Sequence, residues 1–339
     1  MSDTRRPTTR TPSMRGLVLD RYNAPFRLAA LPRPVPEAGQ VLVRVKASGV
    51  NPLDLKIRRG EAAHARHKLP GILGIDLAGI VEAVGPGVST FRRDDEVYGM
   101  TGGVGGLQGS LAEFAAVDAQ LLARKPATLG MREAAACPLI LITAWEGLID
   151  RAGVRAGQRV LVQGAGGVGH IVIQIARAFG ADVFAVDSMA KAPFIHQLGA
   201  TAIDYREVTV EDYVASHTAG RGFDVIYDTV GGAGLDASFK AVARFGHVVS
   251  CLGWGTHALA PLSFRAGTYS GVFTLLPLLT GEGRAHHGEI LRAAAKLAED
   301  GKIVPRVDPR RFTLETADDA YRALEQRDVA GKIIVDVAD

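Results

Sequence analysis

The feature that most constrains this chain is a glycine-rich loop with a strand-like segment before it and a helix-like segment after it. The apolar segment 159–163 leads into Gly164-Ala-Gly166-Gly167-Val168-Gly169, and residues 168–179 then carry apolar side chains at helical spacing. In a βαβ unit the first glycine permits a tight turn, the second lets the backbone approach a pyrophosphate, and the last lets the helix pack closely on the strand. We therefore predict that Gly164, Gly166, Gly167, Val168 and Gly169 bind a dinucleotide, with its pyrophosphate at the helix N-terminus.

The segments after this loop alternate between strand and helix. Apolar strand-like segments occur at 182–186, 202–205, 223–228 and 247–252, and helical patterns of 10–20 residues separate them. Such alternation is typical of a doubly wound parallel sheet. The N-terminal half differs, because short β segments at 41–47, 75–84, 96–100 and 111–117 follow one another with Gly and Pro between them. This N-terminal pattern predicts a β-rich, barrel-like domain. With the doubly wound sheet, the expected fold class is α/β, and 339 residues suffice for about two domains.

Net charge and cysteine usage exclude several classes of partner. The excess of 39 basic over 36 acidic residues lies in residues 1–15, so the rest of the chain is neutral and we expect no nucleic-acid partner. No apolar run is long enough for a membrane span, and no secretory segment is visible, which favours the cytoplasm. Residues 1–14 are expected to be a disordered tail. Cys137 and Cys251 are expected to be buried, reduced thiols.

Three residues bear on which dinucleotide is bound. Asp187 lies 18 residues after Gly169, where an acid usually accepts the ribose 2′-hydroxyl of NAD and repels the 2′-phosphate of NADP. Lys191 and Tyr205 lie close by in sequence and could bind that phosphate instead. The residues alone therefore leave the choice between NAD(H) and NADP(H) open.

Several longer motifs carry a resemblance to a known family. The chain resembles the medium-chain dehydrogenase/reductase superfamily over about residues 14–339, and within it the zinc-independent quinone oxidoreductase and enone reductase branch, which includes zeta-crystallin. The segments that carry the resemblance, besides the glycine loop, are 47–60 (ASGVNPLDLKIRRG), 73–85 (LGIDLAGIVEAVG), 143–145 (TAW), 228–232 (DTVGG) and Gly331-Lys332.

The resemblance implies a fold, a reaction and a set of cofactor contacts. It implies a GroES-like catalytic barrel formed by 15–132 and 271–339, with a Rossmann domain inserted at 133–270. It also implies a homodimer that reduces quinones or the C=C bond of α,β-unsaturated carbonyls with NAD(P)H. NADP(H) is favoured because Lys191 and Tyr205 match the family's phosphate-binding positions. The implied contacts outside the glycine loop are Thr143, Asp187, Lys191, Tyr205, Thr229, Val230, Gly231, Leu252, Gly253, Phe273 and Lys332.

The resemblance also allows the zinc ligands to be compared position by position. Zinc-using relatives have a cysteine where this chain has Asn51, a histidine where it has Ile75, and a third ligand near Leu139. Apolar side chains at two of three positions do not hold zinc, so no metal is expected. An alcohol dehydrogenase remains an alternative function, as does a non-catalytic NAD(P)H-binding sensor.

Reduction without a metal requires hydrogen-bond donors for the developing enolate charge. The candidates are Asn51 and Lys56, because their segment replaces the zinc ligands; Asp54 is expected to orient Lys56 or a ribose. Each of the three is alternatively a structural turn residue, and the proton is alternatively taken from water. The substrate pocket is expected to include Trp145, Trp254 and the loop 102–109, although both tryptophans are alternatively core residues.

Overall fold

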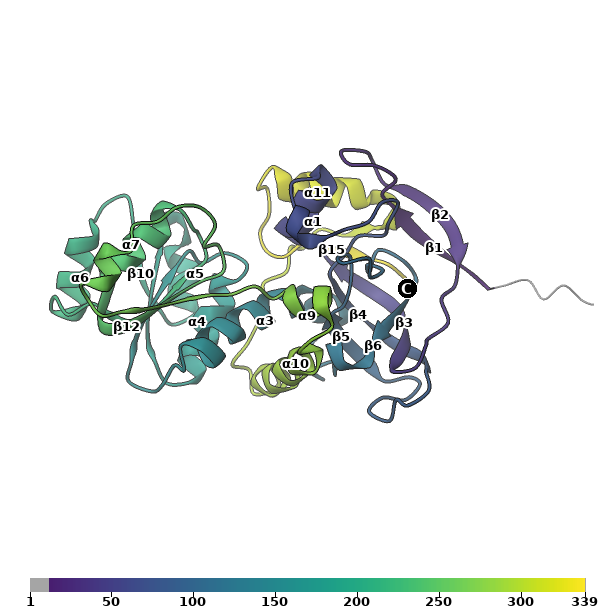
Figure 1. Ribbon diagram of the computed structural model, residues 1–339, viewed down its shortest axis with the longest axis horizontal. Coiled ribbons are helices and arrows are strands. Elements are labelled where there is room, and N and C mark those ends of the chain that lie inside the picture. The colour runs from purple at the N-terminus through teal and green to yellow at the C-terminus, as the bar shows by residue number, and fades with distance from the viewer. Residues whose placement is uncertain (1–11, 339) are drawn as a thin grey trace, which may run out of the picture. The chain divides into compact units, whose positions relative to one another are not determined.

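A computed structural model describes residues 12–338, which divide into two compact units (Figure 1). The barrel unit comprises residues 12–125, 130–136 and 307–338. The Rossmann unit comprises residues 126–129 and 137–306. The predicted α/β fold class, a β-rich catalytic domain with an inserted doubly wound domain, is confirmed.

The barrel unit is built on a mixed sheet with strand order β14-β15-β3-β4-β5-β7, in which β6 also pairs with β3. β3 lies at the centre, and along it Val43 and Val45 are buried whereas Arg44 and Lys46 are partly exposed, which is the alternation of a half-buried strand. The strands of the barrel unit are β1 (Ser13–Val18), β2 (Arg27–Pro32), β3 (Gln40–Gly49), β4 (Asp76–Val84), β5 (Glu96–Met100), β6 (Phe114–Asp118), β7 (Leu122–Arg124), β14 (Phe312–Thr313) and β15 (Ile334–Asp336). Its helices are α1 (Pro52–Arg59), α2 (Met131–Ala136) and α11 (Ala317–Glu325).

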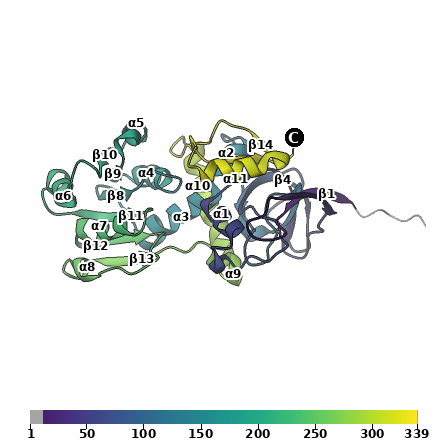
Figure 2. The same ribbon diagram turned by 90° about the horizontal axis from the view of Figure 1, so that it is seen from above.

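The Rossmann unit is built on a parallel sheet of six strands in the order β10-β9-β8-β11-β12-β13. Figure 2 shows helices on both faces of this sheet, as right-handed crossovers that run outward from β8 in both directions require. Its strands are β8 (Arg159–Gln163), β9 (Asp182–Asp187), β10 (Thr201–Asp204), β11 (Phe223–Asp228), β12 (Val242–Ser250) and β13 (Thr268–Gly271). Its helices are α3 (Pro138–Trp145), α4 (Gly169–Ala178), α5 (Ala192–Gln197), α6 (Val210–Thr218), α7 (Ala233–Ala241), α8 (Ala260–Ser263), α9 (Leu276–Thr280) and α10 (Arg284–Glu299).

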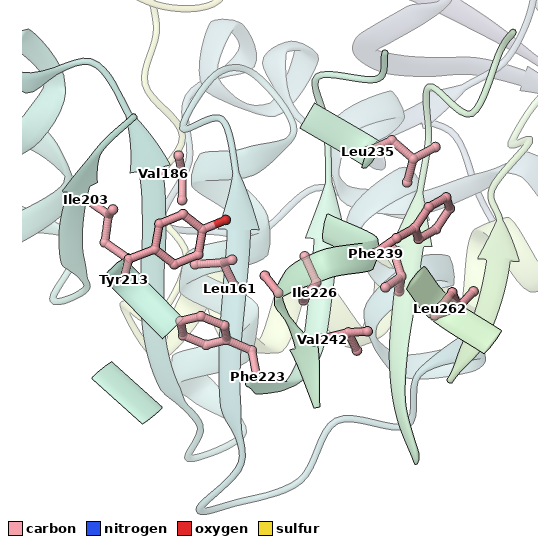
Figure 3. Packing of buried hydrophobic residues seen from close by; sticks show 12 residues of the cluster. Leu161, Val186, Ile203, Tyr213, Phe223, Ile226, Leu235, Phe239, Val242 and Leu262 are labelled. Carbon is pink, nitrogen blue, oxygen red and sulfur yellow. The ribbon is translucent and has the colours of Figure 1, made fainter. Parts of the chain in front are cut away.

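A buried apolar cluster fixes the strands of the Rossmann sheet under α6, α7 and α8 (Figure 3). Tyr213 of α6 and Phe239 of α7 point toward the sheet, where Leu161 and Ile226 are fully buried. Burying side chains of this size stabilises the fold by about 2 kcal/mol each. The cluster therefore holds the strand ends that carry the predicted cofactor residues.

The boundaries of the two units differ from the predicted ones. Residues 1–11 of the predicted tail lie outside the described residues, and β1 already begins at Ser13. The Rossmann unit extends to Arg306 rather than ending at residue 270, because residues of α10 bond to other residues of this unit. His286 of α10 is 2.8 Å from the Asp150 carboxylate, and Glu299 accepts a hydrogen bond from the Ala127 amide. No helix within 12–338 has the length and apolarity needed to cross a membrane.

Candidate cofactor and catalytic sites

The carboxyl edge of the Rossmann sheet brings together most of the predicted cofactor residues. Parallel strands place all their carboxyl ends at one edge, and ligands of such sheets bind there. Each strand of this sheet is followed, or ended, by predicted residues: Gly164 after β8, Asp187 at the end of β9, Tyr205 after β10, Thr229–Gly231 after β11, Leu252 and Gly253 after β12, and Phe273 after β13. The fold thus gathers residues more than 100 positions apart in sequence.

The glycine loop contains two glycines that the fold requires, Gly164 and Gly169, and two that it does not, Gly166 and Gly167. Gly164 has φ +84°, and a Cβ on Gly169 would lie 1.7 Å from the Gly164 carbonyl oxygen. A Cβ on Gly166, by contrast, would meet no described protein atom within 4 Å. Packing therefore does not explain Gly166, whereas a phosphate approaching the backbone at the start of α4 does. The loop fits a dinucleotide pyrophosphate.

A buried carboxylate shapes the turn beside this loop. Asp228, at the end of β11, accepts hydrogen bonds from the amides of Val230 and Gly231 and from the Ser250 hydroxyl, 2.6 Å away. The predicted cofactor segment 229–231 is therefore fixed in place, and Thr229 donates to the Gln163 carbonyl at 2.7 Å. Asp228 was not among the predicted site residues; its place at the head of the 228–232 motif was the available signal.

The Asp187 carboxylate accepts hydrogen bonds from neighbouring groups of the protein itself. Its Oδ2 accepts from the Ala165 amide at 2.8 Å and from Lys191 Nζ at 3.0 Å, and its Oδ1 accepts from the Ser188 amide at 2.8 Å. Burial opposes ionisation, yet these hydrogen bonds hold the pKa of Asp187 below its ordinary value. Asp187 is thus an ionised carboxylate neutralised by Lys191.

Next to this pair lies a second cation that sequence reasoning missed. Tyr205 is 56% exposed, and the Arg206 guanidinium lies 5.5 Å from the centroid of its ring. Arg206 Nε also donates to the Tyr205 hydroxyl at 3.4 Å. A basic residue directly after a predicted site residue at a strand end was the signal that could have revealed it.

The two predicted pocket tryptophans lie in different places. The Trp145 indole packs edge-on against Phe179, at 5.9 Å between centroids, and Phe179 follows the C-terminal end of α4, whose ten residues span about 15 Å from the glycine loop. Trp254 instead packs against Phe273 at the carboxyl edge and is 56% exposed. Thr143, two residues before Trp145, donates its hydroxyl to the Leu139 carbonyl.

A second polar cluster lies in the barrel unit and centres on Asn51. The Asn51 amide nitrogen donates to Asp76 Oδ2 at 3.0 Å, and its amide oxygen accepts from Lys332 Nζ. Asn51 and Asp76 are fully buried, and the Lys332 side chain is 8% exposed, with its Nζ 3.9 Å from Asp76 Oδ2. Asn51 is therefore a positioned core residue, and Lys332, predicted to contact cofactor, is its partner in this cluster.

Asp54 was expected to orient Lys56 or a ribose; the structure contradicts the first of these roles, and the second stays a prediction. Asp54 is fully buried in α1, where its Oδ2 accepts from the Asn51 backbone amide at 2.9 Å and its Oδ1 has no hydrogen-bond partner among the described residues. Burial raises the pKa of Asp54 to about 7. Lys56 is exposed on another face of the helix, because positions two apart on a helix point in different directions.

The side chains at the zinc positions do not fit a zinc ion. Asn51 spends both ends of its amide on Asp76 and Lys332, Ile75 is fully buried and apolar, and Leu139 is an apolar residue of α3. Among residues 12–338, no group of three or more His, Cys, Asp or Glu side chains is arranged to hold a metal. Cys137 is buried and Cys251 partly buried, and neither forms a disulfide.

The loop 102–109, expected to line the substrate pocket, lies between β5 and β6, and its backbone is tightly packed. A Cβ on Gly102 would lie 1.8 Å from the Gln108 carbonyl oxygen, and one on Gly109 would lie 2.1 Å from that of Leu73. The His67 ring also bonds the Gly103 carbonyl at 2.9 Å. Close backbone packing, rather than mobility, explains these glycines.

Comparison with known proteins gives matches over both units. Residues 37–127 match a family described as alcohol dehydrogenase GroES-like domain, and residues 198–335 match one described as zinc-binding dehydrogenase. A 2-methylene-furan-3-one reductase of Solanum lycopersicum is 37% identical, over 87% of this chain and 71% of that protein. A chloroplastic NADPH-dependent alkenal/one oxidoreductase of Arabidopsis thaliana is 36% identical, over 87% and 72% of the two chains.

Solved structures agree with these matches. An alcohol dehydrogenase superfamily protein from Novosphingobium aromaticivorans superposes with a TM-score of 0.94 at 59% identity, over 96% of this chain and all of that one. A quinone oxidoreductase from Coxiella burnetii superposes with a TM-score of 0.80 at 27% identity, over 96% of this chain and all of that one. The similarity therefore spans both units and is not confined to the nucleotide-binding sheet.

Proposed function

The chain belongs to the medium-chain dehydrogenase/reductase superfamily, and on that basis we propose that it uses NADP(H), without zinc, to reduce the C=C bond of α,β-unsaturated carbonyls. The observation that carries this proposal is the carboxyl edge of the Rossmann sheet, where Gly166 leaves room for a pyrophosphate and Asp187 is already neutralised. When bound, NADP(H) supplies the hydride, and the protein supplies binding and orientation.

The preference for NADP(H) rests on the surroundings of Asp187. An acid at this position normally repels a 2′-phosphate, but here its carboxylate is used by the Ala165 and Ser188 amides and by Lys191. Lys191 and Arg206 then provide two cations beside the end of β9, and charge-assisted hydrogen bonds to a phosphate are strong. Asp187 in this setting positions Lys191 rather than a ribose.

The barrel residues divide into positioning and donating roles. Asn51 is held by Asp76 and Lys332, so we assign it to positioning the start of α1. Lys56 on the same helix is exposed, and its ammonium remains able to donate a hydrogen bond to a substrate carbonyl. Asp54 caps the helix from within the core. In this scheme water supplies the proton to the substrate α-carbon.

The proposed substrate class is supported by what similar proteins are named. Two relatives that cover most of this chain are named as reductases of an exocyclic enone and of alkenals or alkenones. Quinones, the substrates named for the Coxiella structure, share the conjugated carbonyl that such a site would polarise. Zinc independence is supported by Asn51 and Ile75, which replace ligand types with side chains that do not hold zinc.

A substrate and cofactor panel tests the proposal. Purified protein should oxidise NADPH with an enone or enal, and bind NADPH at least about tenfold more tightly than NADH. Turnover should survive a chelator, and elemental analysis should find no stoichiometric zinc. Chelator-sensitive ethanol oxidation would instead support an alcohol dehydrogenase, and NADPH binding with no turnover across enones, enals and quinones would support a sensor.

We further propose that the protein forms a homodimer through the free edge of the Rossmann sheet. β13 is an edge strand, and two phenylalanines beside it are strongly exposed: Phe245 at 84% and Phe264 at 86%. Phe245 is tied to the same region by its amide, which donates to the Arg265 carbonyl at 2.8 Å. An exposed edge with large apolar side chains favours pairing with a second copy. Light scattering should give a dimer, and Phe245→Asp with Phe264→Asp should give a monomer.

The two cysteines are consistent with a reducing compartment. Neither Cys137 nor Cys251 forms a disulfide, and burial raises the pKa of Cys251 to about 12, so Cys251 is an unreactive thiol. We propose the cytoplasm as the compartment, because chains kept there retain their thiols. Fractionation of the native host would test this.

A further inference from the structure

A broad groove of about 930 Å³ lies in the Rossmann unit, away from the glycine loop. It is bordered by the second half of α4, by α5 and by the segment 301–306, which follows α10. Its volume is in the range of small-molecule sites. The side chains that give the groove its charge and shape are Gln174, Arg177, Lys191, Phe194, Lys302 and Arg306.

The charge of this groove is strongly one-sided. Arg177, Lys191, Lys302 and Arg306 line it, and none of the described Asp or Glu residues does. Arg177 and Arg306 form no ion pair with any carboxylate among residues 12–338. Lys302 has only an exposed neighbour, Asp300, at 3.8 Å. Of the four cations, Lys191 is paired with Asp187 and Lys302 lies near Asp300, so Arg177 and Arg306 supply the uncompensated charge that attracts a multiply charged anion.

The walls of the groove are fixed by specific contacts. The Gln174 side chain accepts from the Val304 amide at 2.8 Å and donates to the Val304 carbonyl at 3.2 Å, so α4 holds the segment 301–306 by two bonds. The Arg306 guanidinium lies 4.5 Å from the centroid of the Phe194 ring on α5. The backbone of 301–306 and the Arg306 guanidinium are therefore pre-positioned, which lowers the entropic cost of binding.

This groove is separate from the proposed cofactor site. The cofactor site uses the N-terminal end of α4, whereas the groove uses Gln174, Arg177 and Ala178 from its C-terminal half. The described lining includes no residue of 164–169 and neither Asp187 nor Tyr205. Lys191 is the residue that both sites share, and its ammonium is bonded to Asp187.

We propose that this groove binds a polyphosphate group, carried either by a nucleotide or by free inorganic polyphosphate. Arg177, Lys302 and Arg306 supply the charge, and Phe194 supplies an apolar wall next to it. Residues 301–306 lead directly to Val307, where the chain enters the barrel unit. A bound polyanion would therefore also hold the connecting segment against α4 and α5.

Titration of the full chain, saturated with NADPH, tests the proposal with ATP and inorganic triphosphate as separate probes. Either probe should bind at one site per chain, more weakly as salt is raised, and should protect Lys302 and Arg306 against trypsin. Lys302→Gln with Arg306→Gln should weaken binding at least about tenfold. The matched control is Arg155→Gln with Lys240→Gln, which removes the same charge from exposed positions of the same unit and should change affinity less than about twofold.

The two probes distinguish the source of the phosphate. If ATP binds more tightly than triphosphate, and Phe194→Leu lowers the ATP affinity to that of triphosphate, the ligand of the groove is a nucleotide. If the two probes bind equally, the groove recognises the phosphate group alone. The proposal is overturned if neither probe binds NADPH-saturated protein, if NADPH displaces them, or if the control pair weakens binding as much as the groove pair. NADPH affinity should be unchanged in all these variants, because none alters a residue assigned to the cofactor site.

Discussion

The glycine loop of the Rossmann unit and the Asn51 cluster of the barrel unit differ in whether their groups are left open or are already in contact with one another. At the loop, the position of Gly166 is kept open, and no described protein atom would contact a Cβ there. At the cluster, Asn51, Asp76 and Lys332 spend their polar groups on one another in the protein interior. Both regions were singled out by sequence motifs, yet one leaves room for a ligand and the other leaves none.

This difference separates binding residues from positioning residues. A glycine whose Cβ would clash with the fold, such as Gly169, is explained by packing alone, whereas Gly166 is not. In the same way, a polar residue whose partners all come from the chain, such as Asn51, contributes to stability and geometry first. Substitutions that disturb only the open loop or only the closed cluster should therefore have different consequences.

The largest effect is expected when the closed cluster is broken. Lys332→Met should lower the free energy of unfolding by about 3 kcal/mol, because it leaves the buried Asp76 carboxylate and the Asn51 oxygen without their cation. Urea unfolding of the full chain measures this. The matched control is Lys56→Met, the same change at an exposed lysine of the same unit, which should cost less than about 0.5 kcal/mol.

The same cluster offers a sharper check on the cause. Adding Asp76→Asn to Lys332→Met should recover part of the lost stability, since the uncompensated charge is then removed. If Asp76→Asn lowers the stability of the Lys332→Met variant by as much as it lowers the stability of the wild type, charge compensation is the wrong explanation for the cluster.

Gly166 tests whether the glycine loop leaves room for a ligand. Gly166→Val should weaken NADPH binding about 100-fold, equivalent to about 2.7 kcal/mol, and leave thermal stability nearly unchanged, since there is open space at the position of the new Cβ. Calorimetric titration and a thermal melt measure the two quantities. Gly130→Val is the control, because that glycine also has room for a Cβ and does not belong to the loop. Equal loss of stability and affinity would show that Gly166 serves the fold.

Asp54 gives the closed cluster a pH dependence. Its pKa is about 7 in the folded chain and about 4 in an unfolded one, so the folded chain binds more protons between these values. Stability must then fall as pH rises from about 4 to 7. Relative to Asp54→Asn, the wild type should lose about 2.6 kcal/mol of stability between pH 5 and pH 8. A constant difference would mean that the buried carboxyl does not change its charge in this range.

Much of the fold follows from local patterns that the sequence displays. The strand before the glycine loop and the helix after it were expected at 159–163 and 168–179 and lie at Arg159–Gln163 and Gly169–Ala178, because hydrophobic period and glycine spacing are local signals. The compact Rossmann unit ends at Arg306, more than 30 residues beyond the boundary expected at residue 270. A helical pattern at 289–299 shows one apolar face but does not show which unit that face packs on.

The site was predicted less completely, for a similar reason. The predicted cofactor residues at the carboxyl strand ends lie at one edge because a parallel topology places them there. Asp228 and Arg206 were not among the predicted site residues, since their contacts to Ser250 and Tyr205 are encoded by no local pattern. Of the two roles expected for Asp54, orienting Lys56 is contradicted, because side chains two positions apart on a helix point in different directions.

The two tryptophans test the same distinction with the smallest expected effect. Trp145 packs on Phe179 beyond the far end of α4, so Trp145→Leu should change the KM for an enone less than about twofold and lower stability modestly. Trp254 is exposed beside Phe273 at the carboxyl edge, so Trp254→Leu should raise KM several-fold with little loss of stability. Steady-state kinetics and thermal melts of both variants give the comparison. A larger KM change at Trp145 would mean that proximity to the cofactor edge does not decide which aromatic residues contact substrate.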